Sequence, residues 1–112
     1  MSYKIVFTSS FEYSIKKLKK RYRHVKNDTH AAIQVLLQTP KLGAVIPGGF
    51  GVRKLRLRNS DLRKGKSGGY RLIYYVRDEP EQTIYLLLLY AKSDRPNITQ
   101  RELKALLDDL SL

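Results

Sequence analysis

Cysteine is absent from this chain of 112 residues. Without it there is no disulfide, no thiolate zinc site and no cysteine nucleophile, a composition that suits a reducing cytosol. The longest apolar run, Ile84–Ala91, is much shorter than the ~20 residues that cross a bilayer. Met1 leads directly into a strand-like segment, so no signal peptide is expected. These absences favour a cytoplasmic protein.

Acidic residues are also scarce, since 10 Asp and Glu face 22 Lys and Arg, for a net charge of +12. The excess is uneven along the chain. Residues 1–77 carry 18 basic and 3 acidic side chains, a balance of +15, whereas residues 78–112 carry 4 and 7, a balance of −3. Such a distribution indicates a polyanionic partner, namely RNA, DNA or an acidic protein.

Motifs of the common enzyme classes are missing as well. The two histidines, His24 and His30, are not four residues apart, and no carboxylate cluster accompanies them. We interpret both as exposed helix residues. The glycines at 48, 49 and 51 have neither the dinucleotide-binding spacing nor the Lys-Ser/Thr of a P-loop. The sequence therefore predicts no metal and no other cofactor, so any chemistry would depend on Lys, Arg or Tyr side chains.

Hydrophobic periodicity predicts an α+β fold in a single domain over residues 1–112. Spacings of three and four predict helices near 9–22, with Ser9 or Ser10 as the N-cap, and near 24–38. Thr99 and Glu102 fit a capping box that begins a final helix. Alternation and short apolar runs predict four strands, at 3–7, 52–58, 70–77 and 83–91, the last one central in the sheet. Residues 41–51 read as a loop.

These elements give the order β-αα-βββ-α in a small sandwich. Hairpin connections make the last three strands antiparallel, the first strand adds at an edge, and a helical hairpin covers one face. A C-terminal helix completes the mostly antiparallel, packed sheet.

The highest density of positive charge lies between Arg53 and Arg71, where eight of 19 residues are basic and Asp61 is the single acid. Lys54, Arg56 and Arg58 alternate along one strand face, which spaces their Cβ atoms ~6.5–7 Å apart. In an antiparallel meander, Arg71 and Lys92 can approach this row from neighbouring strands. Arrays of Arg and Lys are typical of phosphate-binding sites, although a solvated basic face has the same composition.

Four segments resemble the RelE/HigB family of bacterial toxins, which belong to type II toxin–antitoxin systems and to the wider RelE/ParE superfamily. They are PKLG at 40–43, RKLRLR at 53–58, GKSGGYRLIYY at 65–75 and YLLLLYAKSD at 85–94. Their order and spacing agree with the family over nearly the whole chain. The long basic loop and the YAK ending are more similar to the HigB branch.

The resemblance implies a ribosome-dependent mRNA endoribonuclease, an mRNA interferase that inhibits translation without a metal. It implies a cognate antitoxin as partner, together with the ribosome and mRNA, no membrane, and operator DNA only through the antitoxin. The implied catalytic residues are Lys54, Arg56, Arg71 and Lys92. Further cations are expected to bind RNA, namely Arg53, Arg58, Arg63, Lys64, Lys66 and Arg95.

The chemistry expected of this set is attack of an mRNA 2′-hydroxyl on the adjacent phosphate. Arg71 and Arg56 would stabilise the charge that develops on phosphorus. Lys54 is the expected base, because neighbouring cations disfavour its charged form. Lys92 is the expected acid or second phosphate ligand. Some family members carry an Arg after this Lys and a later Tyr, whereas this chain has Ser93 and no Tyr after Tyr90; Arg95 or Lys92 would then take over their role.

Two other functions remain open at this level. A ParE-like toxin of the same fold would poison DNA gyrase and would not use these cations to cut RNA. A non-catalytic RNA- or ribosome-binding module would use them only to hold phosphates. The tyrosines at 70, 74, 75, 85 and 90 could stack on bases, but core or sheet-surface positions are the simpler interpretation.

Overall fold

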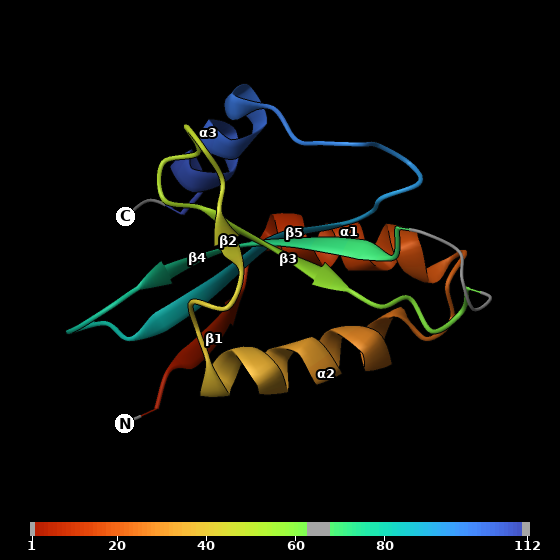
Figure 1. The fold of residues 1–112 in the computed structure, drawn as a ribbon, viewed down its shortest axis with the longest axis horizontal. Helices are drawn as coiled ribbons and strands as arrows, with labels where there is room; N and C mark the ends of the chain where they lie inside the picture. The colour runs from red at the N-terminus through yellow and green to blue at the C-terminus, as the bar shows by residue number, and fades with distance from the viewer. Residues whose placement is uncertain (1, 63–67, 111–112) are drawn as a thin grey trace.

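A computed structural model describes residues 2–62 and 68–110 of the chain. Its elements run β-αα-ββββ-α along the sequence (Figure 1). They are β1 (Lys4–Phe7), α1 (Ser9–Lys19), α2 (Val25–Gln38), β2 (Ala44–Val45), β3 (Arg53–Leu57), β4 (Tyr70–Arg77), β5 (Thr83–Ala91) and α3 (Gln100–Asp108). The predicted α+β fold is confirmed, with one strand more than the sequence indicated.

The strands form one five-stranded sheet in the order β1-β5-β4-β3-β2. The β3, β4 and β5 strands pair antiparallel as predicted. The β1 strand lies at the predicted edge and runs parallel to β5. The apolar strand β5 is an interior strand, but β4 occupies the middle of the sheet. A register irregularity between Ile73 and Tyr74 offsets β4 from β5.

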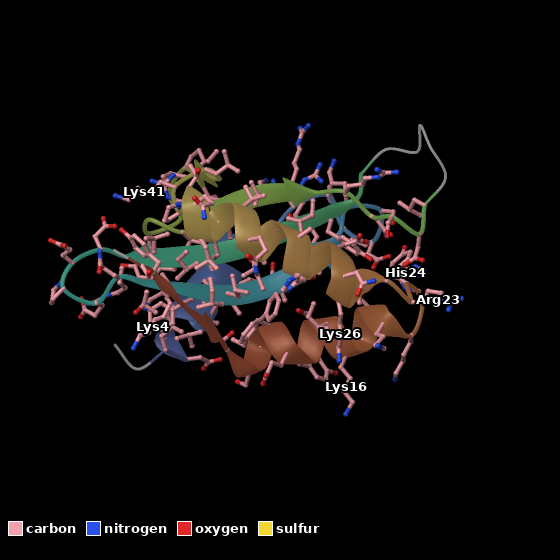
Figure 2. The ribbon with its side chains drawn as sticks, turned by 90° about the horizontal axis from the view of Figure 1, so that it is seen from below. Lys4, Lys16, Arg23, His24, Lys26 and Lys41 are labelled. Atoms are coloured by element: carbon pink, nitrogen blue, oxygen red, sulfur yellow. The ribbon has the colours of Figure 1, made fainter. Side chains whose placement is uncertain are left out.

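Helices cover both faces of the sheet, with α1 and α2 on one side and α3 on the other (Figures 1 and 2). We call these the hairpin face and the α3 face. Alternate residues of each strand feed the two apolar clusters, so that Leu55, Leu57 and Leu72 pack on the hairpin face and Ile73 and Leu87 on the α3 face. The hairpin-face cluster is the larger, and it holds the buried side of α1.

Two further details of the sequence prediction are wrong. Residues 44–45 were expected in a loop, yet Ala44 and Val45 pair with Lys54 and Arg53 as the short edge strand β2; two residues between turns carry too little periodicity to be noticed. The N-cap of α1 is Thr8 rather than Ser9 or Ser10, since its side chain accepts a hydrogen bond from the Phe11 N–H.

The predicted start of α3 is confirmed. The Thr99 side chain accepts from the Glu102 N–H, and the Glu102 carboxylate accepts from the Thr99 N–H, so both halves of a capping box are present. Among residues 2–62 and 68–110, no helix is long and apolar enough to cross a membrane.

Candidate active site

Strand pairing brings three polar side chains into one row across the α3 face. Arg56 of β3 lies opposite Arg71 of β4, and Arg71 lies opposite Tyr90 of β5. Directly opposed residues have Cβ atoms ~4.5–5.5 Å apart. Since Leu55, Leu57 and the neighbours of Arg71 in β4 point to the hairpin face, strand alternation directs this row to the opposite side.

Arg71 is the central member of the row and is more than nine-tenths buried, with 8% of its surface exposed. Its guanidinium donates hydrogen bonds to two main-chain carbonyls, those of Gly68 and Tyr70. None of the ion pairs within the described residues includes it. A buried cation without a carboxylate partner is costly, so the site is suited to receive an anion.

Two glycines before β4 bring Lys92 to Arg71. Gly68 and Gly69 both have positive φ, at 108° and 52°. The Gly68 carbonyl accepts from Arg71, and a Cβ on Gly68 would lie 3.0 Å from the Lys92 Cβ. The Lys92 N–H donates to the Gly69 carbonyl over 2.9 Å. Arg71 and Lys92 therefore both border Gly68 in this backbone turn.

Lys54 and Arg58 lie two residues before and two residues after Arg56. Lys54 belongs to β3, and Arg58 follows its last residue. Lys54 is half-buried and pairs with Ile73 of β4. This pair lies two residues along the strands from the pair of Arg56 and Arg71. Arg58 is exposed beyond the end of β3. Neither side chain forms an ion pair within the described residues. The predicted catalytic residues Lys54, Arg56, Arg71 and Lys92 thus belong to one cationic patch, which we call the β3–β5 patch.

The other predicted RNA-binding residues are placed differently. Arg53 points to the hairpin side, where its guanidinium donates to the carbonyls of Lys41 and Gly43 and anchors the chain before β2. Arg95 forms an ion pair with Glu102, and this pair lowers the pKa of Glu102 to about 2. Arg63, Lys64 and Lys66 lie outside the described residues.

Tyr90 is the member of the row that the sequence analysis grouped with four other tyrosines and did not place beside the cations. It is 5% exposed, and its Oη has no hydrogen-bond partner among the described residues. Burial raises the pKa of its hydroxyl, while Arg95 and Arg71 oppose the rise. Arg95 lies over its ring, 5.3 Å from the centroid. Tyr90 belongs to the α3-face core, and the pairing register places it opposite Arg71.

The histidines lie away from this patch. Both are exposed, as predicted, and His24 contacts Asp61 through Nδ1 over 2.7 Å. The His24 imidazole and main-chain N–H hold the pKa of Asp61 below its ordinary value. Across residues 2–62 and 68–110, no three His, Asp or Glu side chains gather as metal ligands would. The chemistry available at the patch is that of cations and one phenol.

Two comparisons with known proteins bear on the family and the fold of the chain. A family model described as the RelE toxin of the RelE/RelB toxin–antitoxin system matches residues 12–109. Among solved structures, a double-arginine mutant of the E. coli toxin RelE in the free state is similar, with a TM-score of 0.58 and 22% sequence identity. The match covers 86% of this chain and 90% of that one, and it confirms the fold. The nearer resemblance to the HigB branch stays a prediction.

Proposed function

Because the chain belongs to the RelE family of toxins from toxin–antitoxin systems, we propose that it is an endoribonuclease that cuts mRNA on the ribosome and thereby inhibits translation. The observation that carries this proposal is Arg71, a buried guanidinium with no carboxylate partner among the described residues and with Arg56 directly opposite. A scissile phosphate would supply the missing negative charge.

The proposed reaction is a metal-independent transesterification. The 2′-oxygen of one nucleotide attacks the adjacent phosphorus, a P–O2′ bond forms and the P–O5′ bond breaks. One product ends in a 2′,3′-cyclic phosphate and the other begins with a 5′-hydroxyl. The 2′-hydroxyl proton passes to a base, and the leaving 5′-oxygen receives a proton from an acid.

The β3–β5 patch offers a group for each role. Arg71 and Arg56 stabilise the extra charge on the phosphorane, with Arg71 pre-oriented by the Gly68 and Tyr70 carbonyls. Lys54 accepts the 2′-hydroxyl proton, and Lys92 donates a proton to the 5′-oxygen or holds the phosphate. The position of Lys92 supports separate roles for the two lysines. Lys92 borders Gly68 and Lys54 pairs with Ile73, so the two lie on opposite sides of Arg71 along β4.

Cations around the patch would bind the flanking nucleotides. This proposed set consists of Arg58, Arg63, Lys64, Lys66 and Arg95. Arg53 is its weakest member, since its guanidinium already donates to two carbonyls. Arg95 would exchange part of its pairing with Glu102 for RNA phosphate.

The partners follow from the same assignment. We propose that the toxin works in the cytoplasm on ribosome-bound mRNA, and that a cognate antitoxin neutralises it and contributes any binding to operator DNA. No contact of this chain itself with DNA is required.

Cleavage by alanine variants tests the proposal. Arg71→Ala should lower the single-turnover rate of mRNA cleavage on programmed ribosomes by about 10²–10³-fold, the usual loss for a group that stabilises transition-state charge. Lys54→Ala should lower it by about 10²–10⁴-fold, the usual contribution of a general base. Arg77→Ala is the matched control, because Arg77 lies at the far end of β4 and pairs with Glu81. Circular dichroism and antitoxin binding would verify the fold of each variant.

Wild-type rates for both Arg71→Ala and Lys54→Ala would refute the assigned site. Binding to ribosomes without new mRNA ends would indicate a non-catalytic binding module instead. Arrest with DNA-damage signalling and intact mRNA would indicate a gyrase poison of the same fold.

A further inference from the structure

A pocket continues the row of the candidate active site beyond β5. The row ends at Tyr90 of β5, and on the side away from β4 the strand β1 pairs with β5 only as far as Leu86. Helix α1 follows the edge of β5 from there, where the Ser14 Oγ accepts a hydrogen bond from the Leu89 N–H over 3.0 Å. The two elements enclose a space of about 440 Å³, which we call the α1–β5 pocket.

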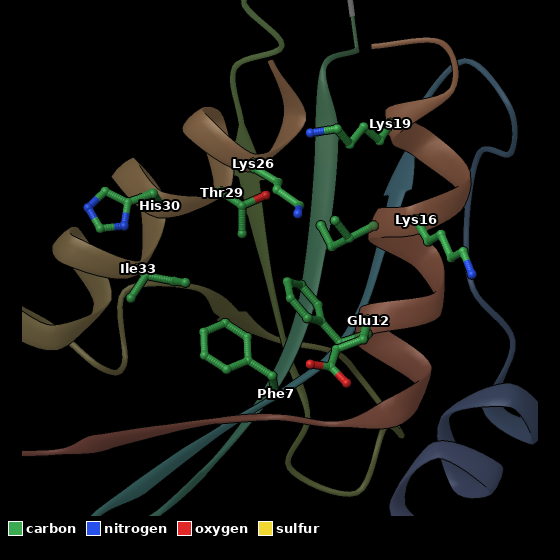
Figure 3. Close-up of a pocket in the computed structure, with 10 residues that line it drawn as sticks. Phe7, Glu12, Lys16, Lys19, Lys26, Thr29, His30 and Ile33 are labelled. Carbon is green, nitrogen blue, oxygen red and sulfur yellow. The ribbon is translucent and has the colours of Figure 1, made fainter. Parts of the chain in front are cut away.

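The walls of the α1–β5 pocket come from α1, from β5 and from the turn after β5. Its aromatic and charged lining residues are Tyr13, Lys17, Arg21, Tyr90, Asp94 and Arg95. Tyr90 packs in the α3-face cluster, so this side of the pocket lies on the face of the β3–β5 patch. Figure 3 shows the chain after β5 on the side of α1 that faces away from α2, and the groove between the two helices is therefore a separate space with other lining residues.

Tyr13 gives the pocket an open aromatic surface. Its side chain is 64% exposed, and the Lys17 Nζ, one helical turn further along α1, lies 5.5 Å from the centroid of its ring. Exposed aromatic rings beside cations are typical of surfaces that bind single-stranded nucleic acid, because the ring stacks on a base and the cation binds a phosphate. The pocket thus has both elements of such a surface next to the candidate active site.

The charges of the pocket suit a nucleobase better than a phosphate. Arg21 pairs with Asp94 and Arg95 pairs with Glu102, so two of the three cations in the lining are already neutralised. Lys17 takes part in no ion pair within the described residues. Asp94 would repel a phosphate, whereas the edge of a base carries donors and acceptors that can bond to a carboxylate and a guanidinium together.

We propose that the α1–β5 pocket binds the base of an mRNA nucleotide next to the scissile phosphate. Tyr13 stacks on the base, Arg21 and Asp94 bond to its edge, and Lys17 binds its outer phosphate. The inference rests on the proposed mRNA cleavage and deepens it, since it assigns contacts to the substrate beyond the reacting phosphate.

Continuity with the candidate active site favours mRNA as the occupant. Tyr90 lies opposite Arg71 on the adjacent strand, at the usual strand spacing of ~4.8 Å, and it also lines the pocket. A nucleotide whose phosphate lies at Arg71 can therefore place its base in the pocket. A second copy of this chain would bring another net charge of +12 and would be repelled.

Messenger RNAs with one abasic nucleotide test the base contact. Cleavage on programmed, subsaturating ribosomes would be compared between an intact codon and codons that are abasic at one position. With the wild type, one position beside the cleavage site should lower the rate at least tenfold, a loss typical of one stacked base. Tyr13→Ala should lower cleavage of the intact codon to a similar extent and should then lose less than twofold more at that position. Losses that multiply in full would show that ring and base act independently and would overturn the proposal.

Two further variants separate stacking from a general effect of exposed rings. Tyr13→Phe keeps the ring and should cleave within twofold of wild type. Phe50→Ala is the matched control, because Phe50 is 53% exposed in the turn between β2 and β3, at the other edge of the sheet. It should keep the wild-type rate and the wild-type sensitivity to the abasic position. An equal loss in Phe50→Ala and Tyr13→Ala would contradict a specific site at Tyr13.

Photocrosslinking locates the base without a cleavage step. The probe is ribosome-bound mRNA with 2′-O-methyl groups, which cannot attack the phosphate, and with 4-thiouridine at each codon position in turn. One position should crosslink to the peptide that contains Tyr13, at least fivefold less in Tyr13→Ala. Crosslinks confined to other elements, or unchanged in Tyr13→Ala, would refute the pocket.

The two proposals fail in different ways. Cleavage that needs Arg71 but is insensitive to Tyr13→Ala would leave the nuclease assignment intact and reject the pocket. Uncut mRNA together with a Tyr13-dependent crosslink would reject the nuclease assignment and support the pocket as an RNA-binding site.

Discussion

At the scale of single residues, Arg71 combines features that stability alone does not favour. Its guanidinium is buried, its described hydrogen bonds go to main-chain carbonyls, and Arg56 is its direct cross-strand neighbour. A like-charged pair across a sheet is destabilising, and burial of a lone charge adds to that cost. Such an arrangement is expected where the protein binds an anion.

Replacing Arg71 with methionine should therefore separate stability from activity. We expect Arg71→Met to abolish mRNA cleavage while the free energy of unfolding stays within about 1 kcal/mol of wild type or rises, because an apolar side chain replaces a desolvated charge. Urea denaturation measures this. Leu72→Ala, at a fully buried neighbour, is the contrast and should cost about 2–5 kcal/mol. A comparable loss for Arg71→Met would mean that Arg71 is mainly structural.

Gly69 is the second residue whose identity the geometry dictates. Its φ is 52°, and a Cβ would lie 2.3 Å from the Leu57 carbonyl oxygen. Gly69→Ala should lower the free energy of unfolding by more than the about 1–2 kcal/mol of backbone strain alone, and it should impair cleavage because the turn holds Lys92. Gly51→Ala is the control, since Gly51 also has positive φ but its Cβ would meet only the Tyr75 ring at 3.5 Å. Similar costs for the two variants would contradict a backbone clash at Gly69.

At the scale of elements, α3 is joined to the patch through its first turn. Glu102 completes the capping box with Thr99 and also pairs with Arg95, whose guanidinium covers Tyr90. One carboxylate thus begins the helix and orients a cation beside the candidate site.

Acid should weaken the contribution of the Glu102 carboxylate to the stability of the fold within a defined pH range. The pKa of Glu102 is about 2 in the fold against an ordinary value of 4.5, so its contribution to stability is complete above about pH 4.5 and is lost as pH falls toward 2. Glu102→Gln should be less stable than wild type at pH 6, and the difference should shrink on acidification. Urea denaturation at pH 6, 4 and 3 measures it, with Glu79→Gln as an exposed-acid control. A difference that stays constant with pH would contradict the assigned ion pair.

At the scale of the whole molecule, positive charge lies on both faces of the sheet. The β3–β5 patch is on the α3 face, whereas Lys16 and Lys26 project from the helical hairpin (Figure 2). The first set is proposed to act on phosphate at close range, and the helix lysines contribute long-range attraction to a polyanion.

The salt dependence of ribosome binding should distinguish lysines that contact phosphate from lysines that only add to the net charge. Binding of the toxin to ribosomes should weaken steeply with salt, because neutralised phosphates release counterions. Lys16→Gln/Lys20→Gln should reduce the slope by up to about two without changing the single-turnover cleavage rate at saturating ribosomes. The control Lys41→Gln/Lys104→Gln removes two lysines that already pair with Asp78 and Asp108. An equal decrease in slope for the control would show that only net charge matters.

Much of this protein follows from its sequence. Periods of two and three to four predicted the helices and the four longer strands, since a buried face imposes its period on the chain wherever an element is long enough. The capping box at Thr99 and Glu102 was also predictable, because its two residues are only three positions apart in the sequence. The candidate cations were identified too, because Lys54 and Arg56 alternate with leucines on one strand and the GGYR and YAK segments resemble a known family.

Only the tertiary structure decided how those cations are grouped. Pairing register is a relation between distant segments, so nothing local indicated that Arg56, Arg71 and Tyr90 share one row, that Arg53 points to the other side, or that Gly68 brings Lys92 to Arg71. The same holds for the α1–β5 pocket, whose lining comes from a helix, a strand and a turn. Sequence determines which side chains an element presents to each face; the packing of elements determines which of them meet.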